Sequence, residues 1–174
     1  MQAKENKIFK LGIYVHVPFC STACDFCAFY QKQPNRKEVL HFIETLKKEI
    51  AQLPDNLQVD TIFFGGGTPG LLLAEDLTAI GEALLAKIGR NFIEWTLEMS
   101  PSTVKADKIK ALKALGVNRL SMGVQSFDEN LLKELGRLHS PRQVYQAYDI
   151  MREGGYSNIN LDMMFALPGQ SDEA

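Results

Sequence analysis

Hydrophobic positions along the chain fall into short apolar runs separated by longer stretches with helical spacing. The apolar runs have the length of buried strands and cover residues 11–17, 59–64, 92–99, 118–124 and 159–166. The intervening stretches repeat their apolar residues every three or four positions and cover residues 36–53, 73–88, 102–115, 128–135 and 141–153. Regular alternation of strands and helices predicts an α/β fold built on a parallel sheet.

Local signals support the ends of these predicted elements. Pro54 follows the first predicted helix, and Gly89 and Gly116 follow the second and third. Ser102 or Thr103 is a suitable N-cap for the third helix, because a short hydroxyl side chain can accept a bond from a free backbone N–H group. We therefore expect each helix to end before the next strand begins.

Two architectures fit this alternation: an open doubly wound sheet and a partial (β/α) barrel. In both, ligands bind at the carboxyl ends of parallel strands. All five predicted strands bring a polar feature to that end: the cysteines after residue 17, Gly65-Gly66-Gly67, Glu98, Gln125 and Asp162. A doubly wound sheet concentrates its site between two strands, so contributions from all five favour the barrel.

Each of these features also has a simpler explanation. A triple glycine is often only a tight turn. Glu98 and Asp162 could be buried carboxylates paired with basic side chains, because a lone acidic group in an apolar strand requires a partner. Gln125 could satisfy a loop, and Arg137 could be a solvated surface charge. Their coincidence at five strand ends favours a shared site over these separate explanations.

Composition narrows the functional class. The chain has 174 residues, is 45% hydrophobic and has a formal net charge of −2 with both signs interspersed. This pattern gives no electrostatic case for binding nucleic acid, and no apolar run approaches the length of a membrane span. Clustered cysteines without an export signal lead us to expect a cytoplasmic protein.

The three cysteines of the chain, Cys20, Cys24 and Cys27, follow the first predicted strand with the spacing C-x3-C-x2-C. Short runs of cysteine thiolates hold iron–sulfur clusters, and three thiolates would leave one iron of a cube without a protein ligand. His16 could instead complete a zinc site, and Cys24 with Cys27 could form a redox pair. The spacing favours the cluster but leaves these alternatives open.

Several motifs resemble those of radical S-adenosylmethionine (SAM) proteins related to oxygen-independent coproporphyrinogen III oxidase. The resemblance rests on residues 14–27, 64–69, 118–127 and 135–139, on Glu98, and on residues 160–162 with 167–170. It implies a partial (β/α)6 barrel, a [4Fe–4S] cluster, and SAM bound at the open iron. It also implies one-electron cleavage of SAM to a radical that abstracts hydrogen.

The same resemblance implies individual roles. Cys20, Cys24 and Cys27 would ligate the cluster. The remaining motif positions would bind SAM: Tyr14 and Phe26 along the molecule, Gly66, Gly67 and Thr68 at its amino group, Glu98 and Asp162 as acidic contacts, and Gln125 and Arg137 as further polar contacts. These residue types suit a ligand that carries an ammonium, a carboxylate, a sulfonium and a ribose.

One departure from the family pattern separates its branches. The decarboxylating oxidases have a further cysteine two residues after the third ligand, where this chain has Phe29. Phe29 resembles the sister branch of heme chaperones, which bind heme and pass it to acceptor proteins. We therefore expect a heme chaperone, with the coproporphyrinogen-dehydrogenase type of oxidoreductase and a non-catalytic remnant as alternatives.

A second departure is length. Family members continue beyond the position of Ala174, so residues 1–174 are expected to be the N-terminal part of a radical SAM core domain, truncated after the fifth strand, without the sixth strand and the C-terminal domain. The resemblance implies heme or a porphyrinogen as ligand, a low-potential electron donor, and a heme acceptor protein as partners. It implies no membrane span.

Overall fold

Five parallel strands form one sheet in the order in which they occur along the chain. The structure is a computed structural model that describes residues 11–22, 24, 26–55 and 57–171. The sheet has the order β1-β2-β3-β4-β5, and every neighbouring pair is parallel. The strands are β1 (Leu11–Val17), β2 (Val59–Gly66), β3 (Glu94–Met99), β4 (Arg119–Gln125) and β5 (Ile159–Met163).

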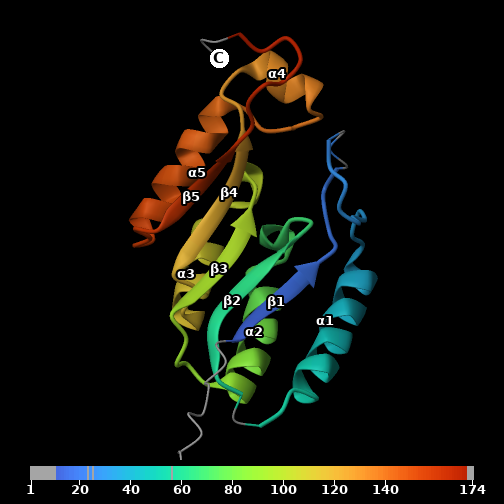
Figure 1. The fold of residues 1–174 in the computed structure, drawn as a ribbon, viewed down its shortest axis with the longest axis vertical. Coiled ribbons are helices and arrows are strands. Elements are labelled where there is room, and N and C mark those ends of the chain that lie inside the picture. Colours follow the sequence, from blue (N-terminus) through green and yellow to red (C-terminus); the bar gives the residue numbers. More distant parts are fainter. Residues whose placement is uncertain (1–10, 23, 25, 56, 172–174) are drawn as a thin grey trace, which may run out of the picture.

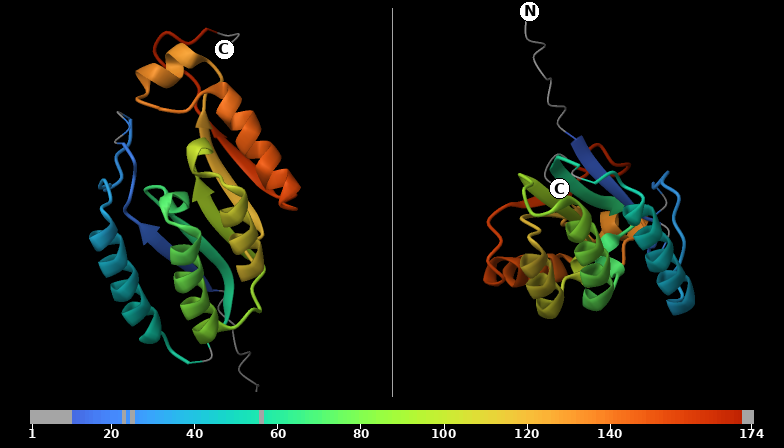
Figure 2. Two further views of the ribbon diagram at one scale, coloured as in Figure 1. Left: turned by 180° about the vertical axis from the view of Figure 1, so that it is seen from behind. Right: turned by 90° about the horizontal axis from the view of Figure 1, so that it is seen from below.

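The long helices pack side by side on one face of this sheet (Figures 1 and 2). The described helices are α1 (Arg36–Ala51), α2 (Ala74–Ile88), α3 (Ala106–Leu115), α4 (Glu129–Glu134) and α5 (Pro141–Glu153), with the short 3-10 helices η1 (Pro69–Leu71) and η2 (Pro101–Thr103). Helix α4 lies beyond the carboxyl ends of the strands, at the top of Figure 1. This end therefore carries the connections that form the candidate site.

The consecutive strand order decides between the two architectures left open by the sequence. A doubly wound sheet reverses direction at a switch point and places helices on both faces. Here the order never reverses, and right-handed crossovers that advance in one direction place the long helices on the same face (Figure 2). This consecutive order with the long helices on one face is the arrangement of a (β/α) barrel, and β1 and β5 are the two edges of the described sheet, so the barrel is partial and the predicted fold class is confirmed.

Alternation of side chains gives the sheet two chemically different faces. Trp95, Leu97 and Met99 of β3 point into the helix-covered core and are at most 3% exposed. Residues one position away point to the opposite face, because successive strand residues alternate in direction. We call this second face the open face, since no described helix covers it (Figure 2). It carries Tyr14, Phe63, Glu98, Arg119 and Asp162.

The structure corrects some predicted boundaries. The third helix begins at Ala106 and not at residue 102, because Pro101–Thr103 form a 3-10 turn closed by the Thr103 hydroxyl on the carbonyl of Ser100 (2.8 Å). Neither predicted cap therefore serves α3, whose N-cap is Lys105. Strand β5 ends at Met163 instead of continuing to residue 166, where Ala166 has φ 57°.

Other ends differ from the predicted ones by one or two residues. Helix α1 ends at Ala51, before the predicted Leu53, and β2 continues through Gly66 into the glycine run. No helix among the described residues is long and apolar enough to cross a membrane.

Candidate functional site

The three cysteines lie on a loop that follows β1 and whose far end, at Lys32, pairs with the residues just after β1. The backbone N–H of Cys20 donates to the carbonyl of Lys32 at 3.1 Å, and the N–H of Lys32 donates to the carbonyl of Pro18 at 2.8 Å. A further bond of 3.0 Å from the N–H of Cys27 to the carbonyl of Cys24 closes a turn between these two residues. All three cysteines are free thiols of intermediate exposure.

The glycine run after β2 allows this loop to approach the sheet closely. The N–H of Gly67 donates to the carbonyl of Val17 (2.8 Å), and the N–H of Thr68 donates to the carbonyl of Phe19 (2.7 Å). A Cβ atom on Gly67 would lie 2.6 Å from the carbonyl oxygen of Phe19, which is backbone and cannot move aside. The glycines are therefore required for packing between the two loops, and these N–H groups are already used within the protein.

One cavity at the carboxyl ends of the strands collects most of the expected residues. Its volume is about 130 Å³. The expected residues in its lining are Cys20, Cys24, Cys27, Phe26, Gly66, Gly67, Thr68, Gln125 and Arg137. Tyr14, Glu98 and Asp162 do not line it. The structure thus divides the expected site into a cysteine cavity and a second group on the open face.

Arg137 connects the cysteine cavity to the end of β4. Its Nη2 donates to the carbonyl of Gly123 at 2.6 Å, and its Nη1 lies 3.5 Å from the Sγ of Cys24. The Nε of Arg137 is buried and has no hydrogen-bond partner among the residues that the structure describes. A buried donor without a partner is costly, so this group is suited to an acceptor that a bound ligand would supply.

Gln125 lies at an irregularity in β4. The pairing of β4 with β5 shifts between Gly123 and Gln125, and Gln125 has φ 71° in the left-handed region. Such a conformation costs about 1–3 kcal/mol in a residue that is not glycine, and it is common at binding sites. The bulge places Gln125 in the lining of the cysteine cavity.

The cysteine nearest the glycine run has a polar neighbour. The Sγ of Cys20 and the hydroxyl oxygen of Thr68 are 3.5 Å apart. Burial raises the pKa of the Cys20 thiol, and the Thr68 hydroxyl acts in the opposite direction by hydrogen bonding. The hydroxyl can therefore donate a hydrogen bond to a thiolate at this position, which would stabilise the charge of a metal-bound sulfur.

Glu98 joins the open face to the glycine run. Its Oε2 accepts a hydrogen bond of 3.2 Å from the N–H of Gly66. Burial raises the pKa of Glu98, the bond from Gly66 partly opposes the rise, and the nearby Asp162 adds to it. A carboxylate in this position is stabilised by a cationic ligand, because the positive charge would offset its loss of solvent.

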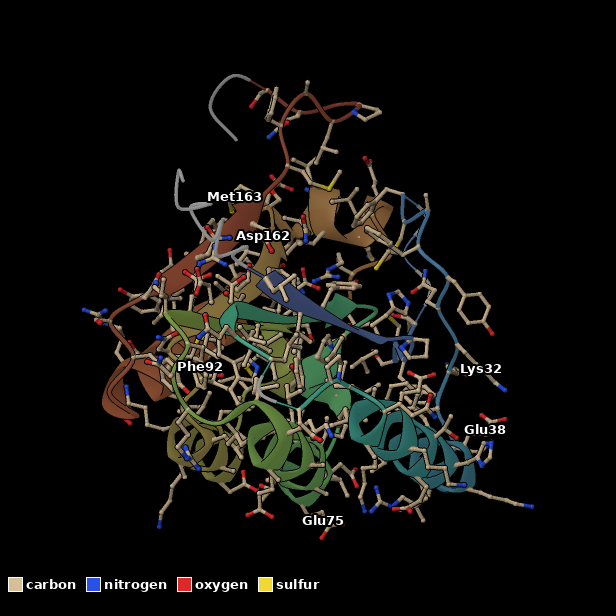
Figure 3. The ribbon with its side chains drawn as sticks, turned by 60° about the horizontal axis from the view of Figure 1, so that its bottom comes forward. Lys32, Glu38, Glu75, Phe92, Asp162 and Met163 are labelled. Carbon is tan, nitrogen blue, oxygen red and sulfur yellow. The ribbon has the colours of Figure 1, made fainter. Side chains whose placement is uncertain are left out.

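Asp162 is held on the open face by two polar side chains that lie in the sequence motifs but received no individual role there. The hydroxyl of Ser121 lies 3.2 Å from Oδ2 of Asp162, and Nδ2 of Asn160 donates to its Oδ1 at 2.5 Å. In Figure 3, Asp162 lies above the sheet, whereas Glu75 lies below it on the helical side. The two-residue spacing of Asn160 and Asp162 was the signal that could have identified this group.

Tyr14 belongs to the same face. Its hydroxyl is 3.1 Å from Nδ1 of His16, and its ring stacks on Phe63 with centroids 6.1 Å apart. Burial, and then the charge of Glu98, raise the pKa of Tyr14. The charge of Glu98 therefore acts on Tyr14, although Tyr14 does not line the cysteine cavity.

His139 is a cavity residue that belongs to the motif at residues 135–139 but received no individual role from the sequence. It is 7% exposed, and its Nε2 is 3.0 Å from the carbonyl of Val124. Burial lowers the pKa of His139, the charge of Arg137 lowers it further, and the bond to Val124 acts in the opposite direction. A neutral ring that donates to a carbonyl holds the β4 end in place and leaves this nitrogen unable to bind a metal.

The donor set fits a cluster ligated by three cysteines. No group of three or more Cys, His, Asp or Glu side chains in the described part of the chain is arranged to hold a metal ion as it stands. The three thiols nevertheless line one cavity. His16 is absent from that lining, and its Nδ1 is already bonded to Tyr14. The described residues thus offer three thiols and no evident fourth ligand, which suits a [4Fe–4S] cluster better than zinc.

Comparison with known proteins identifies the family. The sequence profile of the radical SAM superfamily matches residues 14–174. The chain belongs to the radical SAM superfamily. This membership confirms the resemblance seen in the motifs, and the family implies a [4Fe–4S] cluster and SAM.

Relatives within the radical SAM superfamily include two groups of heme-related proteins. The chain is 39% identical to the heme chaperone HemW of Bacillus subtilis over 91% of its own length and 43% of the relative's length. It is 36% identical to the heme chaperone HemW of Escherichia coli, covering 96% of this chain and 46% of the relative. It is 34% identical to the oxygen-independent coproporphyrinogen III oxidase of Bradyrhizobium diazoefficiens, covering 92% and 37%.

Solved structures give the same assignment of fold. Coproporphyrinogen III oxidase (HemN) from Escherichia coli, a radical SAM enzyme, superposes with a TM-score of 0.85 at 29% identity, over 94% of this chain and 39% of that one. The cobalamin-dependent SAM radical enzyme OxsB, solved with SAM bound, shares the fold at a TM-score of 0.61 and 16% identity. The chain therefore spans less than half the length of the curated relatives named here.

Proposed function

We propose that this chain is the N-terminal part of the core domain of a radical SAM protein of heme metabolism, of the heme chaperone type. The observation that carries the proposal is the cavity lined by three free thiols, beside which no fourth metal ligand is evident among the described residues. When bound there, a reduced [4Fe–4S] cluster supplies the electron for cleavage of SAM.

The polar groups around this cavity match the charges of SAM. Arg137, with its unpartnered Nε, would bind the SAM carboxylate, and Glu98 beside Gly66 would accept its ammonium group. Asp162, held by Ser121 and Asn160, would accept from the ribose hydroxyls. Gln125, Phe26 and Thr68 would complete the contacts from the cavity wall. In this proposal Cys20, Cys24 and Cys27 ligate the cluster.

Two observations bear on the choice between chaperone and oxidase. Phe29 occupies the position of the further cysteine of the oxidases, and it is 64% exposed beside the cysteine loop. Of the three curated relatives reported above, the two at 39% and 36% identity are named heme chaperones, and the one at 34% identity is named a coproporphyrinogen III oxidase. The oxidase is the second candidate, because a coproporphyrinogen III oxidase gives the TM-score of 0.85. In either case the ligand would be a tetrapyrrole.

Anaerobic reconstitution tests the core of this proposal. We expect the chain loaded with iron and sulfide to contain a [4Fe–4S] cluster whose EPR spectrum changes when SAM is added, because SAM occupies the open iron. Cys20→Ala, Cys24→Ala and Cys27→Ala should each abolish the cluster. Tight binding of zinc with no EPR response to SAM would contradict the proposal.

Two assays on the reconstituted protein separate the alternatives. A Soret change on heme titration supports the chaperone, whereas anaerobic formation of protoporphyrinogen from coproporphyrinogen III supports the oxidase. Reductive formation of 5′-deoxyadenosine from SAM would exclude a non-catalytic remnant. The same reconstituted protein, incubated with candidate acceptor and electron-transfer proteins, tests the proposed heme acceptor and low-potential electron donor.

A further inference from the structure

The open face carries a row of side chains that runs straight across four strands. Tyr14 on β1 is paired with Phe63 on β2, Phe63 with Thr96 on β3, and Thr96 with Arg119 on β4. Neighbouring strands are about 4.8 Å apart, so the ends of this row are separated by about 14 Å. We call these four residues the lower row.

The two ends of the lower row differ in chemistry. At one end, Tyr14 and Phe63 form a stacked aromatic pair, and Tyr14 is 55% exposed. At the other end is the guanidinium of Arg119. Between them, Thr96 is fully buried, and its hydroxyl is in hydrogen-bond contact with Arg119 and Glu94. The lower row therefore has an aromatic pair at one end and a cation at the other, with a covered threonine between them.

Arg119 has N–H donors that form no hydrogen bond within the described part of the chain. Its Nη1 donates to the hydroxyl of Thr96 at 3.2 Å, and that hydroxyl donates to Glu94 at 2.9 Å. Arg119 forms no ion pair with a carboxylate within the described part of the chain. A guanidinium has five N–H donors arranged to bind a carboxylate in two places, so most of this capacity is available to a ligand.

The next row toward the carboxyl ends has the opposite character. His16 is paired with Gly65, and Glu98 is paired with Ser121, two residues further along the strands than the lower row. Two residues of a strand span about 6.6 Å. Glu98 and Asp162 make this upper part acidic, which suits the cationic SAM, while Arg119 below them suits an anion. Charge thus separates two ligand positions along the same strands.

We infer that the lower row binds a flat, apolar ring system with a carboxylate at its edge, and that Arg119 holds this carboxylate. The ring would lie on Tyr14 and Phe63, and the acid group would reach Arg119 across Thr96. This inference rests on the proposed function, because a tetrapyrrole with propionate side chains is the ligand class that the proposal gives this chain. It adds the residue that orients such a ligand.

Binding of a metal-free porphyrin to the full chain tests the inference without the cluster. Mesoporphyrin IX carries two propionates, and its dimethyl ester lacks both charges. Quenching of the chain's single tryptophan, Trp95, reports binding of either compound. Because the porphyrin has no iron, the measurement depends on neither metal coordination nor SAM.

The variants should separate the contribution of the acid group to binding from that of the ring. We expect Arg119→Gln to weaken mesoporphyrin IX about tenfold or more, the size of a lost charged hydrogen bond, and to leave the ester unchanged. Arg119→Lys should retain part of the difference. Phe63→Leu should weaken both compounds to the same extent. Arg142→Gln, an exposed arginine on α5, is the matched control and should change neither.

Thermal unfolding of each variant checks that it is folded. Equal weakening of acid and ester by Arg119→Gln, equal affinity of the wild-type chain for both compounds, or no binding of mesoporphyrin IX at all would each overturn the inference. A chain that binds mesoporphyrin IX through Arg119 but assembles no cluster would contradict the proposed function alone. A chain that assembles the cluster but binds mesoporphyrin IX and its dimethyl ester with equal affinity would contradict this inference alone.

Discussion

The carboxylate of Glu98 accepts a hydrogen bond of 3.2 Å from the backbone N–H of Gly66. This contact joins the two parts of the candidate site, because Gly66 lines the cysteine cavity and Glu98 belongs to the open face. Gly66 has φ 106°, and a Cβ atom there would lie 2.5 Å from the ring of His16. A side chain at this position would therefore disturb both parts at once.

Replacement of Glu98 by Gln should change how stability depends on pH. Burial raises the pKa of Glu98 above its ordinary value of 4.5, the Gly66 N–H partly opposes this, and Asp162 adds to it. Ionisation is therefore costly in the folded state. The contribution of Glu98 to stability is complete below its unfolded pKa and is lost as pH rises through the raised folded pKa, with a slope of at most about 1.4 kcal/mol per pH unit.

Urea unfolding of the wild-type and Glu98→Gln chains at a series of pH values from about 4 to 8 measures this difference. We expect Glu98→Gln to gain stability relative to wild type as pH rises through this window. Glu153→Gln, on the exposed surface of α5, is the control and should follow the wild-type curve. Parallel curves for Glu98→Gln and wild type would show that Glu98 ionises without cost.

Gly67→Ala should destabilise the chain and disorganise the cysteine loop. The new methyl group would meet the carbonyl oxygens of Phe19 at 2.6 Å and Val17 at 2.9 Å. Such overpacking costs about 1–3 kcal/mol. It would also disturb the hydrogen bonds from Gly67 and Thr68 that hold the cysteine loop. Urea unfolding and the iron content after reconstitution measure the two effects.

Gly89→Ala provides the comparison for this prediction. Gly89 has φ 75° and ψ −161°, a conformation almost exclusive to glycine, but open space where a Cβ atom would lie, so alanine there meets only backbone strain, about 1–3 kcal/mol. We expect Gly89→Ala to lower stability and retain full iron loading. A Gly67→Ala chain that loads iron normally would refute the role of Gly67 in positioning the cysteine loop.

Arg137→Lys should weaken SAM binding although the charge is retained. Arg137 contacts the carbonyl of Gly123 and the Sγ of Cys24 through two different nitrogens. Lysine has a single ammonium group and cannot reproduce this planar arrangement. We expect a loss of SAM affinity of about tenfold, measured by equilibrium dialysis of the reconstituted protein. Arg142→Lys should have no effect, and unchanged SAM affinity in Arg137→Lys would remove Arg137 from the binding site.

Tyr156→Phe should leave the fold intact and increase its stability. Tyr156 is 2% exposed, and its hydroxyl has no hydrogen-bond partner in the described part of the chain. Removing a buried polar group that has no partner removes its desolvation cost, so the free energy of unfolding should rise by about 1 kcal/mol. Thermal unfolding measures the change, with Tyr145→Phe on the exposed face of α5 as the control. A lower stability of Tyr156→Phe would mean that its hydroxyl is satisfied in solution.

Local sequence signals were sufficient for most elements. The apolar runs located all five strands, and the glycine and proline signals placed most helix ends within a few residues. Thr103 shows where such signals fail, because its hydroxyl closes a 3-10 turn with Ser100 and does not cap α3. Both uses are open to a hydroxyl side chain, and only the path of the chain after β3 selects between them.

The sequence by itself determined the chemical groups: three thiols at C-x3-C-x2-C spacing, the glycine run, and one polar feature at the end of each strand. Tertiary structure decided which of them meet. It placed Thr68 and Arg137 with the cysteines but Tyr14, Glu98 and Asp162 on the open face, and it aligned Arg119 with Phe63 in one row. The spacing of residues along one strand follows from local geometry. The register between two strands depends on how the helices pack, and no single segment of the sequence encodes that packing.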